Sequence, residues 1–352
     1  GVGRQATTWI LVVGVGVLGS LYAVLGGLRA VAISDTVNGV GFLIAGLLVP
    51  YLALRMIGSG DMWSGLSEVY KGHPEKFDIT GDEPGSYLPF SVLFTGMIVN
   101  QIFFWCTNQS IVQRALGAKS LAEGQKGVLL AAFFKIIGPL VIVLPGIIAF
   151  HLFASDLGEE GAMQAYPRLV KHVLPVALTG VFAAVMVGAI LSTFNSVLNS
   201  SATLFSEGIY SHLVSHDPSD AERVRVGRAC SVVLAVTAML IAPNIDTTGS
   251  LYQYLQQINA TFFGPMLAVI LMGMLTRWAT PLSAKLTLVG GPLVFYGLVF
   301  AWGEQVQSFA REAFSLSEDI HFLHMLTFVF LLAIFVMTLC SRCFPREQAA
   351  EA

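Results

Sequence analysis

The stretch VLLAAFFKIIGPLVIVLPGIIAF, residues 128–150, decides the fold class. It exceeds the roughly 20 predominantly apolar residues that carry a helix across the hydrocarbon core of a bilayer, and its one charged residue is Lys135. Transmembrane β-strands alternate apolar and polar residues in segments of about 10, and this run does not alternate. We therefore expect an all-α, polytopic membrane protein.

The composition of the whole chain agrees with this expectation. Of the 352 residues, 55% are hydrophobic and 12% are charged, whereas soluble domains carry about 25% charged residues. So few charges cannot cover the surface of a soluble globule, and a disordered chain would be less hydrophobic. With 19 Lys+Arg against 22 Asp+Glu, the chain also lacks the basic surface that nucleic-acid binding requires. The expected environment is the lipid bilayer.

The same length criterion, about 20 predominantly apolar residues per spanning helix, gives about nine candidate spans. We expect them to form one membrane domain, residues 1–352. The short loops on one side hold more Lys and Arg than the long acidic loops on the other, which places the basic side in the cytoplasm. We expect a multi-pass protein of the plasma membrane, typically the bacterial inner membrane. The expected spans are 8–28, 36–57, 88–108, 127–152, 173–205, 226–244, 250–276, 284–303 and 321–341.

Polar residues inside the span 173–205 follow a helical pattern. Ser192, Asn195, Ser196 and Asn199 have i, i+3, i+4, i+7 spacing, so they share one helical face. Hydroxyls on such a face favour close helix packing, in which they bond to backbone carbonyls. The same oxygens also suit a hard cation such as an alkali ion. Both interpretations stay open, and they are compatible.

Two other stretches predict irregular structure in the membrane. Lys135 lies well inside its span, where an ammonium group either snorkels to the interface or lines a polar cavity. The Gly138-Pro139 and Pro145-Gly146 steps that follow it predict a break or kink. Residues 247–265, TTGSLYQYLQQINATFFGP, are too polar for a lipid-facing helix. They predict an unwound helix around a cavity, or an extramembrane connector.

Broken helices and a polar interior are typical of secondary transporters. The chain shows no nucleophile beside a base and no histidine spacing for a metal, so we do not expect an enzyme. Because the chain starts at Gly1 and enters an apolar run almost at once, we also expect it to be an excerpt of a longer protein.

Three strings resemble the sodium/solute symporter family. YAVLGGLRAVAISDTVNGV (22–40) is similar to its pattern Y-x-x-x-G-G-L-x-A-x-x-x-x-D-x-x-Q, with Asn38 in place of Gln. WCTNQSIVQRALGAKSLAEGQKG (105–127) resembles its W-C/G-T/F-N/D-Q-x-x-x-Q-R motif, and AILSTFNSVLNSSATLFSEGIY (189–210) resembles its sodium-site helix. We expect its relatives among the bacterial members of the sodium–glucose cotransporter branch. The resemblance implies the inverted-repeat fold of the leucine transporter, here partial, without the opening helices of the first repeat.

The resemblance also implies roles for individual residues. The sodium ligands correspond to Ser192, Thr193 and the carbonyl of Ala189, and Asp35 corresponds to an acidic residue on the sodium exit route. Phe104 stands where sugar carriers have a stacking tyrosine, so the aromatic face remains and the hydroxyl is lost. The remaining expected solute contacts are Gln101, the pocket lysine Lys135, the outer-gate aromatic Tyr252 and the amide Gln256.

The function expected from this resemblance is a sodium-coupled symporter that imports a small polar solute, most simply a sugar or polyol, by alternating access. Its cofactor is a sodium ion. Two alternatives stay open. One is a symporter for a carboxylate or amino-acid-like solute, which Lys135 would tolerate. The other is a non-transporting membrane sensor or assembly module with the same fold.

Overall fold

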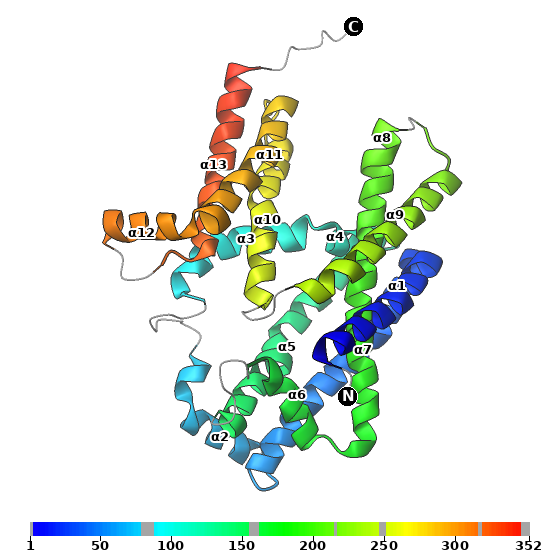
Figure 1. Cartoon of the computed structure of the whole chain (residues 1–352), viewed down its shortest axis with the longest axis vertical. Coiled ribbons are helices and arrows are strands. Elements are labelled where there is room, and N and C mark those ends of the chain that lie inside the picture. Colours follow the sequence, from blue (N-terminus) through cyan, green and yellow to red (C-terminus); the bar gives the residue numbers. More distant parts are fainter. Residues whose placement is uncertain are drawn as a thin grey trace. The chain divides into compact units, whose positions relative to one another are not determined.

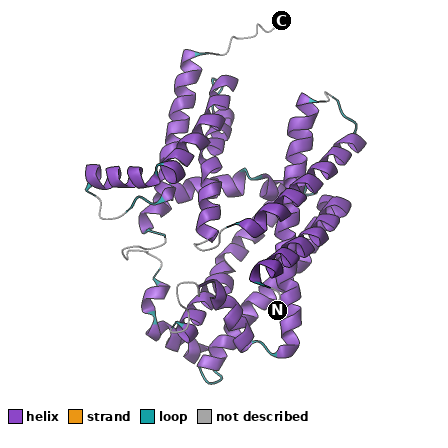
Figure 2. Cartoon of the chain, in the orientation of Figure 1, coloured by secondary structure: helices purple, strands orange, loops and turns teal. Residues whose placement is uncertain are grey.

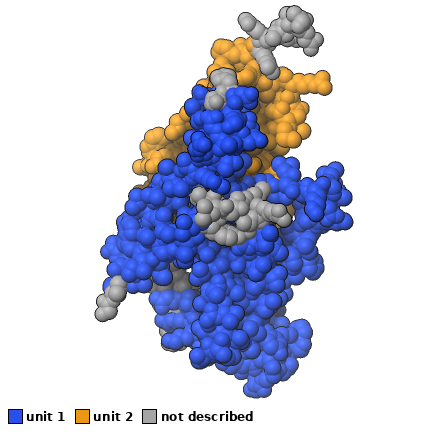
Figure 3. Space-filling view, turned by 90° about the vertical axis from the view of Figure 1, so that its right-hand side faces the viewer, with its two compact units in different colours: residues 1–77, 113–248 blue, residues 78–112, 249–352 orange. Residues whose placement is uncertain are grey.

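The computed structural model describes residues 3–78, 88–154, 162–214, 217–245, 251–315 and 319–345, with the side chains of 4, 22–30, 162–163 and 314 excepted. The regular elements in this part of the chain are all helices (Figure 2). They form two compact units, residues 1–77 with 113–248 and residues 78–112 with 249–352, which Figure 3 colours separately. The single domain expected from the sequence stays a prediction.

Unit 1 is arranged around α1 (Arg4–Ile57), which packs along α7 (Val176–Thr203) and also contacts α5 (Leu121–Phe153) and α9 (Asp220–Ile241) (Figure 1). Its buried core joins the end of α1 to α2 and α5 through Val49, Leu54, Val69 and Ile148, together with α6. The remaining elements of the unit are α2 (Met62–Gly72), η1 (Pro74–Phe77), α6 (Ala162–Val173), η4 (Leu204–Tyr210), α8 (Ser211–Leu213) and η5 (Ala242–Asn244).

Helix α1 is a single helix of 54 residues that covers both expected spans, 8–28 and 36–57. It is not a straight rod, because Gly19 lies against Phe194 and Gly41 lies against Val185, so two distant parts of α1 meet one short stretch of α7. Pro50 lies inside it. The helix ends in a tight turn where Gly60 has φ +109°, a conformation that favours glycine.

Unit 2 packs α10 (Leu251–Leu275), α11 (Pro281–Tyr296) and α13 (Phe322–Cys343) against one another, and α3 (Gly96–Cys106) lies against α10 and α13. Phe103 of α3 stacks on Phe263 of α10 with ring centroids 4.3 Å apart. The unit also contains η2 (Phe90–Phe94), η6 (Gly297–Ala301) and α12 (Gly303–Phe314). Between the units in sequence, α4 (Gln109–Leu116) begins in unit 2 and ends in unit 1.

His324 joins the start of α13 to the η2–α3 junction. Its Nδ1 lies 3.0 Å from the Thr95 hydroxyl and its Nε2 lies 3.1 Å from the Ser91 hydroxyl. Gly96 comes so close to α13 that an added Cβ would lie 1.9 Å from the Leu323 carbonyl oxygen. These contacts fix where α3 begins.

Local sequence explains several helix ends. Ser120 accepts a hydrogen bond from the amide of Glu123, and Ser219 accepts one from the amide of Glu222. Both are S-x-x-E sequences, which satisfy the free amides of a first helical turn. Thr280 caps α11 in the same way, through the amide of Ser283.

Seven helices in the described part of the chain are long and apolar enough to cross a membrane. The expected spans 8–28 and 88–108 correspond to shorter apolar helices, Gln5–Leu21 and Gly96–Cys106. The span 88–108 is divided because Thr95 has φ −124° and ψ −112°, which no helix accommodates. The seven longer helices are Val31–Ile57, Leu121–Phe153, Val176–Leu213, Asp220–Asn244, Leu251–Leu275, Pro281–Ala301 and Phe322–Cys343.

Two expectations of broken helices are wrong, whereas a kink at the prolines of α5, the other expectation there, stays a prediction. Helix α5 continues through Pro139 and Pro145 without a break. Helix α10 is regular from Leu251 and includes Pro265, so the described part of 247–265 is neither unwound nor a connector; residues 247–250 lie outside the described residues. A proline removes one backbone hydrogen bond, and the flanking turns of a long apolar helix in a membrane tolerate that loss.

Candidate functional site

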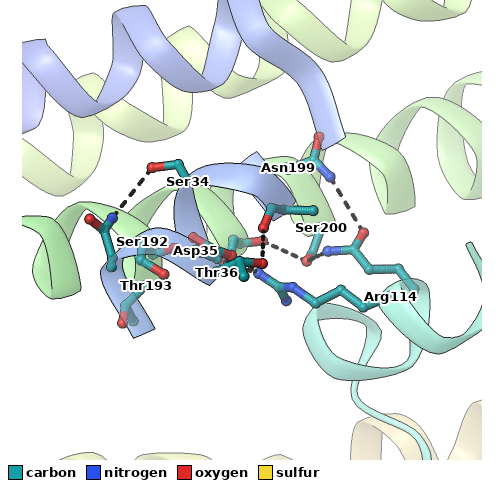
Figure 4. A network of polar contacts seen from close by, with 12 residues as sticks. Ser34, Asp35, Thr36, Arg114, Ser192, Thr193, Asn199 and Ser200 are labelled. Carbon is teal, nitrogen blue, oxygen red and sulfur yellow. Dashed lines mark hydrogen bonds and ion pairs between the residues drawn. The ribbon is translucent and has the colours of Figure 1, made fainter. Parts of the chain in front are cut away.

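An ion pair between α1 and α4 forms the centre of a polar network in unit 1 (Figure 4). Asp35 Oδ2 lies 2.5 Å from Arg114 Nη2, and the same nitrogen donates to the Ser196 hydroxyl of α7. The Asp35 side chain is 17% exposed and that of Arg114 is 33% exposed. Asp35 Oδ1 is buried without a hydrogen-bond partner among the described residues, so this carboxylate keeps one oxygen for a further ligand or water.

A second layer of the network attaches α4 to α7. Gln113 Nε2 donates to the Ser200 hydroxyl at 2.8 Å, and Asn199 Nδ2 donates to Gln113 Oε1 at 3.5 Å. Gln113 and Ser200 are both buried. Because buried amides and hydroxyls are costly when they lack partners, these bonds fix the end of α4 on the polar face of α7.

The polar face of α7 behaves as the close-packing interpretation predicts. Ser196 donates to the Ser192 carbonyl at 2.7 Å, and Ser200 donates to the Ser196 carbonyl at 2.6 Å. Asn195, Ser196 and Ser200 are buried, whereas Ser192 and Asn199 are partly buried. The prediction that these side chains share a face turned toward other helices is confirmed.

Asn38 and Gly188 form a second close contact between α1 and α7. Asn38 Nδ2 donates to the Gly188 carbonyl at 3.1 Å and to the Ser34 hydroxyl at 3.3 Å. A Cβ added at Gly188 would lie 2.6 Å from Asn38 Oδ1. The amide therefore occupies the space that the missing side chain leaves.

The expected sodium ligands lie one turn along α7 from this network. Thr193 donates its hydroxyl to the Ala189 carbonyl at 3.2 Å, and Ser192 is the neighbouring residue. Thr193 is exposed, and Ala189 and Ser192 are partly buried. This set offers hydroxyl and carbonyl oxygens only, which is the donor chemistry of a hard monovalent cation and not of zinc or copper. The residues present fit a sodium ion.

Four of the five expected solute residues lie in unit 2, on two helices that pack together. Gln101 and Phe104 are on α3, and Tyr252 and Gln256 are on α10. Gln101 Oε1 accepts from Trp105 Nε1 at 2.9 Å. The Tyr252 ring is 63% exposed. The fifth residue, the exposed Lys135, is on α5 of unit 1.

Sequence reasoning gave no role to Arg114, Gln113 or Asn38, which hold the polar network together. The signal was present, because Gln113 and Arg114 end the Q-R motif and Asn38 replaces a glutamine in the first motif. An amide or guanidinium group inside a membrane segment requires hydrogen-bond partners. The sequence shows that requirement, and only the structure shows which residues are the partners.

Two curated proteins are similar in sequence to this chain. The uncharacterised symporter YidK of Escherichia coli is 41% identical over 346 residues, which are 98% of this chain and 57% of that protein. The sodium/glucose cotransporter of Vibrio parahaemolyticus is 36% identical over 297 residues, 79% of this chain and 54% of that protein. This chain thus spans a little over half the length of these relatives.

A solved structure has the same fold. A sodium-coupled sialic acid symporter in a substrate-bound outward-open state superposes with a TM-score of 0.75 at 19% identity, over 97% of this chain and 68% of that one. The expected all-helical symporter fold of the leucine-transporter type is therefore confirmed. Residues 3–291 match the model of one family, and membership of that family also explains the three motifs. The chain belongs to the sodium:solute symporter family.

Proposed function

We propose that this chain forms the part of a sodium-coupled symporter that holds the sodium ion and contributes to the solute site, and that the solute is a neutral sugar or polyol. The protein is a multi-pass membrane protein and not an enzyme, as its family requires. The inner membrane is the proposed location, by analogy with the Escherichia coli relative.

The observation that carries the proposal is the oxygen-only donor set of Ala189, Ser192 and Thr193 on α7, which is linked through Ser196 to the Asp35–Arg114 ion pair of α1 and α4. Hydroxyl and carbonyl oxygens select an alkali ion, and Asp35 Oδ1 has no hydrogen-bond partner among the described residues. The amides of Gln101 and Gln256 with the rings of Phe104 and Tyr252 suit a solute that has hydroxyl groups and an apolar face.

The energetics of such a carrier are sufficient. One charge that moves down a potential of 100 mV releases about 2.3 kcal/mol. A tenfold sodium gradient adds about 1.4 kcal/mol. One sodium ion could thus sustain a solute gradient of several hundred-fold. Coupling requires that sodium favour the solute-binding conformation, since equal binding to both conformations shifts nothing.

The test is uptake by the full-length protein in proteoliposomes, with labelled glucose, myo-inositol and a sugar acid, with and without an inward sodium gradient. Thr193→Ala should raise the half-saturating sodium concentration at least about tenfold, equivalent to about 1.4 kcal/mol of sodium binding. Thr237→Ala is the matched control, because Thr237 is also exposed and also donates to the carbonyl four residues before it, Val233.

Each outcome has a clear meaning. Sodium-stimulated uptake of a neutral sugar that is lost in Thr193→Ala and kept in Thr237→Ala supports the proposal. Sodium-driven uptake of the sugar acid alone would overturn the solute class and favour the carboxylate alternative, for which Lys135 is the specific observation. Binding without any sodium-stimulated uptake would overturn the transport function and favour a sensor.

A further inference from the structure

Unit 2 contains a cavity of about 900 Å³ that is separate from the expected solute residues. Gln253 and Gln257 of α10 line one wall, and α12 lines another. In Figure 1, α12 leads away from the α10–α13 bundle of the unit. Among the other lining residues are Leu298, Val299, Glu304, Ser308, Arg311 and Phe322.

The walls of this cavity are held in place. Gln307 makes two hydrogen bonds with the backbone of Ile320: its Nε2 donates to the carbonyl at 2.8 Å, and its Oε1 accepts from the amide at 2.7 Å. Arg311 Nε lies 3.3 Å from Asp319 Oδ1. Both contacts join α12 to the segment that precedes α13. The cavity is therefore formed before any ligand arrives, as most small-molecule sites are.

The lining has the chemistry of a site for a hydroxylated molecule. Gln253 and Gln257 are four residues apart, so their amides lie on one face of α10 and can both donate and accept. Ser308 donates its own proton to backbone carbonyls of α12, at 2.9 Å to Glu304 and 3.0 Å to Gln305. Its oxygen therefore remains as an acceptor. Leu298, Val299 and Phe322 supply apolar surface for the carbon face of a sugar.

The charges of the lining discriminate between solutes. Arg311 and Asp319 compensate each other, because they form an ion pair. Glu304 then leaves a net negative charge on the cavity. A carboxylate in the solute would be repelled, whereas a neutral polyol would not.

We propose that this cavity is a second binding site, specific for a neutral sugar or polyol and closed to sugar acids. The choice of ligand class rests on the proposed function, and the site itself rests on the cavity. Gln253 directly follows Tyr252, the expected gate aromatic. Gln257 directly follows Gln256, the expected solute amide. A ligand in the cavity thus contacts the same turns of α10 that carry the expected solute residues. Its binding therefore alters transport of the solute bound at those residues.

The experiment measures equilibrium binding of labelled glucose, myo-inositol and glucuronate to the full-length protein in detergent. Ser308→Trp places a bulky ring in the cavity and obstructs it, and Ser308→Ala is the matched control that keeps it open. The wild type and Ser308→Ala should bind glucose or myo-inositol at two sites, Ser308→Trp at one, and glucuronate should not occupy the second site. Glu304→Gln should admit glucuronate there. One binding site in the wild type would overturn the proposal, as would a second site that persists in Ser308→Trp.

A second measurement does not depend on a bulky side chain. In Ser308→Cys, with the native Cys106, Cys230, Cys340 and Cys343 replaced by serine, a methanethiosulfonate reagent should modify residue 308 more slowly when glucose is present. Glucuronate should give no protection. Equal modification rates with and without glucose would overturn the proposal.

These results are distinguishable from failure of the proposed function. Gln256→Ala should remove the transport-linked site, and glucose should still protect residue 308 in Ser308→Cys. If uptake fails in the wild type while glucose still protects residue 308, the proposed function is wrong and the cavity site stands. If uptake behaves as expected and protection is absent, only the cavity site is wrong.

Discussion

Arg114 Nη2 lies 2.5 Å from Asp35 Oδ2, so the only carboxylate of the polar network in the described part of unit 1 is neutralised by a guanidinium group from another helix. The guanidinium group also contacts Ser196, four residues beyond the expected sodium ligand Ser192. A sodium ion near Asp35 would therefore compete with Arg114 for the same negative charge.

The first prediction concerns this ion pair. Arg114→Met leaves a partly buried carboxylate without its partner and should destabilise the protein by about 1–3 kcal/mol, less than the cost of breaking a fully buried pair because both side chains are partly exposed. Adding Asp35→Asn should recover part of the loss. Thermal unfolding of the four members of this cycle measures the coupling. Arg228→Met, at an exposed position on α9, is the control. Additive effects of the two changes would contradict the ion pair.

The second prediction concerns the approach of α1 to α7. Gly188→Ala would place a Cβ 2.6 Å from Asn38 Oδ1 and should displace the amide from the Gly188 carbonyl. We expect a loss of about 1–3 kcal/mol in unfolding free energy, the usual cost of overpacking. The control on the same helix is Gly180→Ala, where nothing lies within 4 Å of the added atom.

Gly180→Ala should instead be neutral or stabilising by up to about 1 kcal/mol, because alanine is the better helix former. In the Gly188→Ala background, Asn38→Ser should restore part of the stability, since the shorter side chain leaves room for the new methyl group. Equal effects of the two alanine substitutions would show that α1 and α7 do not meet at Asn38.

The third prediction concerns the placement of α3. His324→Leu removes the contacts with Thr95 and Ser91, and with about 0.5–1.5 kcal/mol for each hydrogen bond it should cost about 1–3 kcal/mol. Since α3 carries Gln101 and Phe104, the KM for the solute should rise while the half-saturating sodium concentration stays unchanged. His324→Gln keeps a donor and an acceptor and should restore part of the solute KM. A change in sodium dependence alone would contradict this role.

The fourth prediction concerns solute selectivity. Phe104→Tyr adds a hydroxyl to a ring that lies at the edge of Trp105, with centroids 5.3 Å apart. If that hydroxyl gains one net hydrogen bond to a sugar, worth about 0.5–1.5 kcal/mol, the KM for a neutral hexose should fall about 2- to 10-fold. Competition uptake assays measure this. Phe94→Tyr, at a ring that is 69% exposed, should change nothing; an equal effect there would point to a general effect of the hydroxyl.

The helical periodicity of the sequence predicted the polar face of α7 correctly, because burial of Asn195 and Ser196 follows directly from their spacing. The local rules for proline in a helix were less successful in α5. Local rules gave a break or a kink at Pro139 and Pro145, and the break is absent because neighbouring helical turns keep α5 continuous. Propensity describes an isolated segment, and the membrane penalises an open backbone more than it penalises one missing bond.

The partners of the polar network could not be predicted from the sequence. Asp35 and Arg114 are 79 residues apart, and Gln113 and Ser200 are 87 apart. No periodicity within one helix reports such pairs. The motifs identified which positions carry polar groups, and helix packing determined which of them meet.

The proline inside α1 has a mechanical consequence. Pro50 cannot donate to the carbonyl of Gly46, so one backbone hydrogen bond of the helix is missing at this point. From Gly46 to Asp35 the helix forms an arm about 16 Å long. A bend of only about 10° there would swing the far end of this arm by about 3 Å, more than the 2.5 Å that separates Asp35 from Arg114. A small flexure at one joint would suffice to release the carboxylate.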